Sequence, residues 1–156
     1  MEISRATIDD AEGILALQKL AFRRQAELYD DWALPPLVET LEDLRSKFAD
    51  HAFLKAVAGS EIVGSVRARV EGDVCHVGRL VVDPGHQRKG LASALMRAIE
   101  AEFPTVHQFE LFTGTKSEGS IRLYRKLGYV PCGTKVVSSK VSHVTLVKQR
   151  EPVASE

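Results

Sequence analysis

The chain has 156 residues, 44% of them hydrophobic and 27% charged, which favours one ordinary globular domain over two domains or a disordered chain. Lysine plus arginine and aspartate plus glutamate both total 21, and this zero net charge gives no global attraction for nucleic acid or anionic lipid. Two cysteines without metal-ligand spacing, no apolar signal core and no membrane-length apolar run leave a cytoplasmic enzyme or binding domain, with no metal and no membrane partner.

The first half of the chain is predicted to form a strand, two helices and three consecutive strands. The expected elements are a strand over 3–7, a helix carrying Ile14, Leu15, Gln18 and Phe22, a loop over 29–36, a helix carrying Leu37, Leu41, Leu44 and Phe48, and strands over 53–58, 62–70 and 74–82. Thr7 and Asp10 have the spacing of a capping box before the first helix.

The second half alternates between helices and strands. The expected elements are a helix from Gly90 to about Phe103, a strand over 109–113, a loop over 114–118, a helix carrying Ile121, Tyr124 and Leu127 with a left-handed cap at Gly128, and strands over 129–135 and 141–148. Three consecutive strands followed by this alternation predict an α/β fold with a central mixed β-sheet and helices on both faces. The domain is expected to span residues 1–148, with a polar tail over 149–156.

The segment from 80 to 93 carries the clearest functional signal, because a buried strand runs through a short turn directly into a helix. The first turn of a helix has free N–H groups and a partial positive charge, so it can bind an anion. Gly90 and Ala92 leave this turn bare, and Arg88 and Lys89 add positive charge. The pattern is neither a P-loop nor a dinucleotide-binding loop. From the residues alone, a plain helix start explains it as well as a phosphate site does.

Two motifs resemble those of a known family. Gln87-x-x-Gly90-x-Ala92 is similar to the Q/R-x-x-G-x-G/A signature of the GCN5-related N-acetyltransferases (GNAT), and Tyr124 lies in a segment, 120–129, that resembles their L-Y-x-x-x-G-F/Y helix and turn. The resemblance covers about residues 3–148. It implies the GNAT acyl-CoA N-acyltransferase fold and an enzyme that transfers an acetyl group from acetyl-coenzyme A (acetyl-CoA) to a primary amine, by direct attack in a ternary complex.

The same resemblance implies which residues bind acetyl-CoA. The N–H groups of the turn would hold the pyrophosphate, the backbone of 80–82 would pair with the pantetheine arm, and one of these N–H groups would face the thioester carbonyl. Ser117 stands where many relatives have an asparagine that bonds the pantetheine, although a helix N-cap is an equally suitable role for it. The full set is Leu80, Val81, Val82, Arg88, Lys89, Gly90, Leu91, Ala92, Ser93 and Ser117.

Tyr124 matches the family tyrosine that protonates the departing thiolate. An unperturbed tyrosine titrates near ~10, so it carries its proton at neutral pH, as a general acid must. The alternative is a core tyrosine, because Ile121 and Leu127 share its helix face. The motif favours the general-acid role of Tyr124.

The acceptor amine must lose a proton before it attacks, and His76 is the first candidate for the base. One of the base-relay histidines of arylalkylamine acetyltransferases corresponds to His76, and strand alternation predicts that His76 shares a face with Gly78, Leu80 and Val82. A half-buried histidine with a structural hydrogen bond is the alternative. Glu110, on the neighbouring strand, is a second candidate.

The acceptor itself stays open between a small-molecule amine and a peptide amine. In relatives, the loop that corresponds to Tyr29, Asp30, Asp31 and Trp32 shapes the acceptor pocket, and its carboxylates would suit a cationic amine. A solvated surface loop is the alternative. Homodimers are common in the family. A non-catalytic acyl-CoA-binding or sensing domain and a transferase with another acyl donor are the competing hypotheses, because fold does not determine function.

Overall fold

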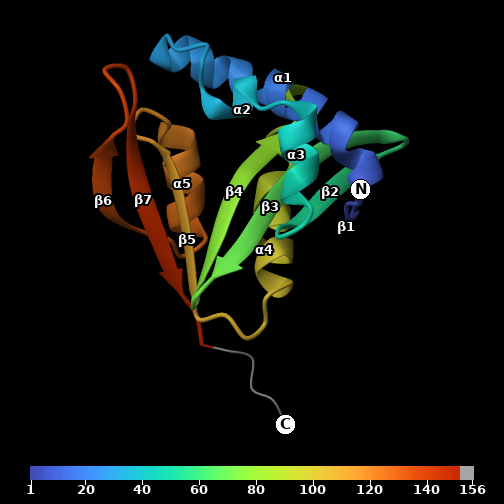
Figure 1. Ribbon diagram of the computed structural model, residues 1–156. Coiled ribbons are helices and arrows are strands. Elements are labelled where there is room, and N and C mark those ends of the chain that lie inside the picture. The colour runs from blue at the N-terminus through green and yellow to red at the C-terminus, as the bar shows by residue number, and fades with distance from the viewer. Residues whose placement is uncertain (152–156) are drawn as a thin grey trace.

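A computed structural model describes residues 1–151 as a seven-stranded sheet in the order β1-β2-β3-β4-β5-β7-β6, with helices on both faces (Figure 1). The strands are β1 (Glu2–Arg5), β2 (Ala52–Ala58), β3 (Glu61–Glu71), β4 (Val74–Val82), β5 (Gln108–Gly114), β6 (Val130–Val136) and β7 (Ser142–Gln149). The helices are α1 (Ala11–Tyr29), α2 (Pro35–Val38), α3 (Leu41–Lys47), α4 (Leu91–Ala101) and α5 (Glu118–Lys126). The predicted mixed α/β fold is confirmed.

The sheet consists of two antiparallel parts joined by one short parallel ladder. One part is β1 to β4, and the other is β5 to β7. Between them, β4 and β5 share three residue pairs: Val74 with Gln108, Cys75 with Phe109, and His76 with Glu110. Beyond His76 the two strands diverge, and Figure 1 shows the resulting V.

The hydrophobic cores lie on the two faces of the sheet. Leu95 and Ile99, in the apolar stripe of α4, are completely buried against residues of both sheet parts, such as Cys75 and Phe109. On the opposite face, a smaller core joins α1 and α3 to β2, and Phe53 stacks on a neighbouring phenylalanine ring with 3.9 Å between centroids. Helices therefore pack on both faces of the sheet.

Local sequence signals place most element ends correctly. The N–H of Thr7 donates to the carboxylate of Asp10 at 2.9 Å, as expected for the capping box, and Gly128 ends α5 with a φ of +101°. The helix expected through Leu37 to Phe48 is instead two helices. Its second part restarts at Thr40, whose hydroxyl accepts a hydrogen bond from the Asp43 N–H at 3.1 Å.

The ordered structure extends into the first residues of the expected polar tail over 149–156. Gln149 is the last residue of β7. The guanidinium of Arg150 donates to the carbonyls of Glu100, Phe103 and Val106. The rest of the expected tail, residues 152–156, lies outside the described residues.

A β-bulge in β4 changes which side chains share a face. Arg79 and Leu80 together stand opposite the single residue Val66 of β3, and Arg79 has a φ of +51°. The flanking pairs are Arg67 with Gly78 and Ser65 with Val81. Because a bulge inserts one residue, the alternation shifts by one, and Leu80 and Val82 pack in the α4-side core with Cys75. The prediction that His76 shares its face with Leu80 and Val82 is therefore wrong.

Candidate active site

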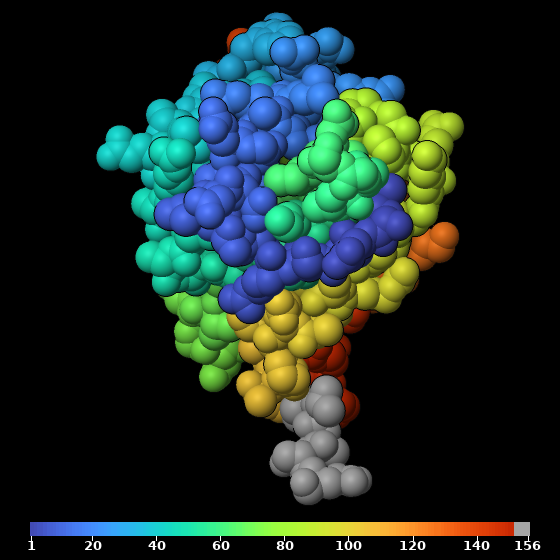
Figure 2. Space-filling model, turned by 90° about the vertical axis from the view of Figure 1, so that its right-hand side faces the viewer, coloured from blue at the N-terminus to red at the C-terminus, as the bar shows by residue number. Residues whose placement is uncertain are grey.

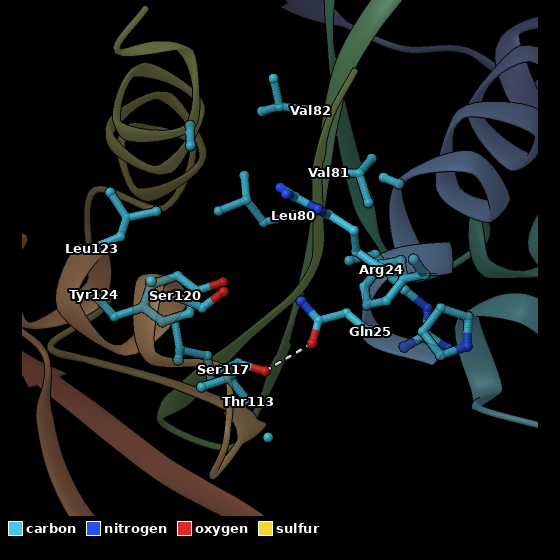
Figure 3. A pocket seen from close by; sticks show the side chains of 18 of the residues that line it. Arg24, Gln25, Leu80, Val81, Val82, Thr113, Ser117, Ser120, Leu123 and Tyr124 are labelled. Carbon is cyan, nitrogen blue, oxygen red and sulfur yellow. Dashed lines mark hydrogen bonds between the residues drawn. The ribbon is translucent and has the colours of Figure 1, made fainter. Parts of the chain in front are cut away.

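A cleft of about 1330 Å³ opens where β4 and β5 diverge. One wall is β4 from Val77 to Val82 together with the first turn of α4, and the other is the end of β5 with α5. Parts of α1 and α2 also line the cleft, and Figure 3 shows it from close by. The cleft is large enough for an extended ligand and a second small molecule, since typical ligand pockets measure ~300–1,000 Å³.

The β4 wall offers backbone groups that the sheet does not use. The ladder between β4 and β5 ends at His76, so the β5-facing edge from Val77 to Val82 has no strand partner among residues 1–151. Such an edge presents N–H and C=O groups that can pair with an extended ligand. The predicted residues Leu80, Val81 and Val82 all line the cleft here.

The turn between β4 and α4 presents further free donors. Arg88 and Gly90 have left-handed φ values of +64° and +77°, and no side chain caps the start of α4 in the described chain. A Cβ atom on Gly90 would meet nothing within 4 Å, so the first-turn N–H groups are open to a ligand. The turn is exposed and forms the yellow-green projection at the upper right of Figure 2. Of the residues predicted here, Lys89 alone does not line the cleft; Arg88, Gly90, Leu91, Ala92 and Ser93 do.

Tyr124 lies on the opposite wall, in the last turn of α5. Its ring packs edge-on against Tyr129, with 6.1 Å between centroids, and its hydroxyl has no hydrogen-bond partner within residues 1–151. Figure 3 shows Tyr124 and Ser120 pointing from α5 toward Leu80 of β4. Burial raises the pKa of Tyr124 to about 12, so the hydroxyl keeps its proton at neutral pH and can donate it.

Ser117 belongs to a hydrogen-bonded bridge across the cleft. Its hydroxyl donates to Gln25 Oε1 at 2.8 Å (Figure 3). It also accepts from the hydroxyl of Tyr29 at 2.8 Å. The Tyr29 hydroxyl in turn accepts from the Lys116 N–H at 2.9 Å. Ser117 is the N-cap residue of α5, but its side chain makes no cap hydrogen bond. The hydroxyl is thus engaged with α1.

Tyr29 does not lie in the predicted loop over 29–36; it is the buried last residue of α1. The signal that could have placed it is the spacing of Phe22, Ala26 and Tyr29, which continues the apolar stripe of the first helix by two turns. Aspartates at positions 30 and 31 obscured that pattern.

The two candidate bases lie side by side, but outside the walls of the cleft. His76 and Glu110 form the last pair of the parallel ladder, with 3.4 Å between His76 Nδ1 and Glu110 Oε2. Neither lines the cleft, which begins one residue further along β4. His143, which sequence reasoning missed, does line it and stacks on Phe112 with 4.6 Å between centroids.

Comparison with known proteins identifies the family. Residues 14–129 match the family described as the acetyltransferase (GNAT) family. The chain belongs to the GNAT family. It is therefore an acyltransferase, and the motif resemblance is confirmed. No curated protein matches this GNAT chain in sequence.

Solved structures share the fold of this GNAT acetyltransferase. The ribosomal-protein-S18-alanine N-acetyltransferase of Escherichia coli is 17% identical with a TM-score of 0.80, covering 99% of this chain and 96% of its own. The PaiA N-acetyltransferase of Thermoplasma acidophilum, in complex with coenzyme A, is 16% identical with a TM-score of 0.74, covering 96% and 98%. The ribosomal-protein-alanine N-acetyltransferase of Brucella melitensis is 20% identical with a TM-score of 0.75, covering 96% and 100%.

The cleft of this acetyltransferase has two groups of backbone donors that fit the chemistry of coenzyme A. The unpaired edge of β4 suits the amide-containing pantetheine arm, and the bare first turn of α4 suits the pyrophosphate. In contrast, Asp30 and Asp31 do not line the cleft, so the carboxylates expected beside a cationic amine do not face it. Within residues 1–151, no helix has the length and apolarity to cross a bilayer, and no metal-ligating side chains gather in groups of three or more.

Proposed function

We propose that this protein transfers the acetyl group of acetyl-CoA to a primary amine, by direct attack of the amine on the thioester in a ternary complex. The observation that carries the proposal is the unpaired edge of β4 lying across the cleft from the unbonded hydroxyl of Tyr124. One wall offers backbone groups that would bind an extended thioester. The other wall offers a proton for the thiolate that leaves.

The binding residues follow from the same two walls. The N–H groups from Arg88 to Ser93 would hold the pyrophosphate, and the backbone from Leu80 to Val82 would pair with pantetheine. Ser117 would contribute a wall of the cleft rather than a free donor, since its hydroxyl already donates to Gln25.

Proton transfer would use two separate sites. Tyr124, whose pKa burial raises to about 12, would protonate the thiolate without itself ionising in the physiological range. His76 would accept the amine proton through water, because its side chain lies one residue outside the cleft and is 39% exposed. Glu110, at 3.4 Å, would orient the imidazole and stabilise its charged form.

The test is thiol release from acetyl-CoA with a panel of amines. Tyr124→Phe should lower turnover by roughly 10²–10⁴ and leave the Kd of coenzyme A nearly unchanged. His76→Gln should lower turnover most at low pH, where the amine is protonated. Tyr129→Phe is the matched control, because it removes a buried hydroxyl that donates to Glu100 outside the cleft. It should keep its turnover per folded molecule.

Two outcomes would contradict this mechanism. If acetyl-CoA binds but no amine releases its thiol, the protein is an acyl-CoA-binding or sensing domain. If Tyr124→Phe retains normal turnover when chemistry limits the rate, Tyr124 is not the acid. The panel should include peptides with N-terminal alanine, because the Escherichia coli and Brucella melitensis enzymes are named for alanine of a ribosomal protein.

A further inference from the structure

One buried cluster beside the cleft contains two guanidinium groups and a single carboxylate. Glu39 is 8% exposed, and its oxygens accept from the Gln18 amide at 2.9 Å and from both Nη atoms of Arg67 at 3.2–3.3 Å. Arg79 approaches the same carboxylate through Nε at 3.6 Å, beyond hydrogen-bond distance. The cluster therefore carries one excess positive charge.

The guanidinium of Arg79 is paired with Glu39 at 3.6 Å but makes no hydrogen bond within residues 1–151. Its Nε is buried without a hydrogen-bond partner, and no other atom of Arg79 donates to an acceptor within residues 1–151. Burial and the nearby charge of Arg67 lower the pKa of Arg79, and Glu39 offsets this only in part. A guanidinium in such surroundings gains from a second anion, and it binds a carboxylate through a two-pronged fork.

The bulge turns this guanidinium to the face of β4 opposite the α4-side core. Leu80 and Val82 pack toward α4, whereas Arg79 turns toward Glu39, which lies between α2 and α3. Arg79 also lines the cleft. Consecutive Cα atoms are ~3.8 Å apart, so Arg79 lies next to the strand segment that would bind the thioester.

The remaining charges of the cleft do not neutralise Arg79. The carboxylates that line the cleft are Glu27 and Glu118, and neither forms an ion pair in the described part of the chain. The cleft also contains Arg24 and Lys116, which lack ion pairs there as well. An acceptor that brings only positive charge meets repulsion in this site.

We propose that the acceptor is a small amine that also carries a carboxylate, as an amino acid does, and that Arg79 binds that carboxylate. This inference rests on the proposed amine acetylation. Arg79 and Leu80 both line the cleft, so the carboxylate and the attacking nitrogen of one small acceptor would share this space. The bridge from Gln25 and Tyr29 to Ser117 crosses the cleft and favours a small acceptor over a polypeptide segment.

The experiment compares matched acceptors that differ only in the carboxylate. The panel contains the L-amino acids, their carboxamides, phenethylamine and a peptide amide that begins with alanine, and kcat/KM comes from thiol release. The best amino acid should exceed its own amide by about tenfold or more. Arg79→Gln should remove that advantage by raising KM for the acid, leaving the amide and the Kd of coenzyme A unchanged, and Arg79→Lys should retain part of it.

A control and two contrary results complete the test. Arg69→Gln removes an exposed arginine that pairs with Glu71 outside the cleft, so it should preserve the preference for the acid. If the amides or the alanine peptide match the amino acids in wild-type kcat/KM, the proposed class of acceptor is wrong, although acetyl transfer itself still stands. If none of the amines in the panel causes thiol release, the proposed function is overturned, and this inference with it. The wild-type comparison decides the matter even if Arg79→Gln fails to fold.

Discussion

Gly114 is the residue against which the Tyr29 ring is packed, and an added methyl group tests the bridge over the cleft. A Cβ atom at position 114 would overlap the hydroxyl oxygen and Cζ of Tyr29 and would stand 3.0 Å from its Cε2. Gly114→Ala must therefore push the ring away. The displaced hydroxyl would lose its hydrogen bonds to Ser117 and from the Lys116 N–H, at 2.8 and 2.9 Å.

The cost follows from these contacts. Overpacking a tight site costs ~1–3 kcal/mol, and each lost hydrogen bond adds ~0.5–1.5 kcal/mol. We expect Gly114→Ala to lower the free energy of unfolding by about 2–6 kcal/mol, a large part of the ~5–15 kcal/mol that stabilises a typical domain.

Urea denaturation in two backgrounds measures this cost. Leucine at position 29 lacks the atoms that the new methyl group would meet, so Gly114→Ala should cost only ~0–1 kcal/mol in Tyr29→Leu protein. Gly133→Ala is the matched control, because a Cβ there meets nothing within 4 Å. An equal cost of Gly114→Ala in both backgrounds would refute the close approach of Tyr29 to Gly114.

Three further predictions concern other parts of the molecule. Gly90→Glu places a bulky anion at the bare start of α4, so the affinity for coenzyme A should fall by about tenfold or more in calorimetry on folded protein. Burial raises the pKa of Glu39, but hydrogen bonding to Gln18 and the nearby guanidinium charges bring it below its usual value. The stability that this carboxylate adds is thus present at neutral pH and lost as pH falls through its folded pKa, so denaturation of Glu39→Gln should show a weaker acid dependence below about pH 4.5. Cys132 is exposed, whereas burial raises the pKa of Cys75 to about 12, so a thiol reagent at pH 8 should modify Cys132 alone until the protein unfolds.

Much of the site could be predicted because its signals are local. The turn from Gln87 to Ser93 joins a strand to a helix within a few residues. Gly90 adopts its left-handed φ there because glycine has no Cβ atom. The end of α5 at Gly128 is local in the same way. Short-range backbone chemistry decides such features, and it can be read from consecutive residues.

The parts that escaped prediction depend on distant partners. At the bulge, two residues of β4, Arg79 and Leu80, stand opposite Val66 of β3. The sequence does not indicate this bulge, because Arg79 is not a glycine although its φ is +51°. Tyr29 and Ser117 meet although 88 positions separate them. Simple alternation puts Leu80 and Val82 on the face of His76, and it fails because the intervening bulge is defined only by the sheet register.

The V is held at both of its ends, and this affects the thermodynamics of ligand entry. Three residue pairs close the bottom, and the Gln25–Ser117–Tyr29 bridge ties α1 to the other arm near the top. The spacing of the walls is therefore set before any ligand arrives. Preorganisation of this kind avoids the loss of conformational entropy that a closing lid would incur, so binding energy is available for affinity instead of for ordering the protein.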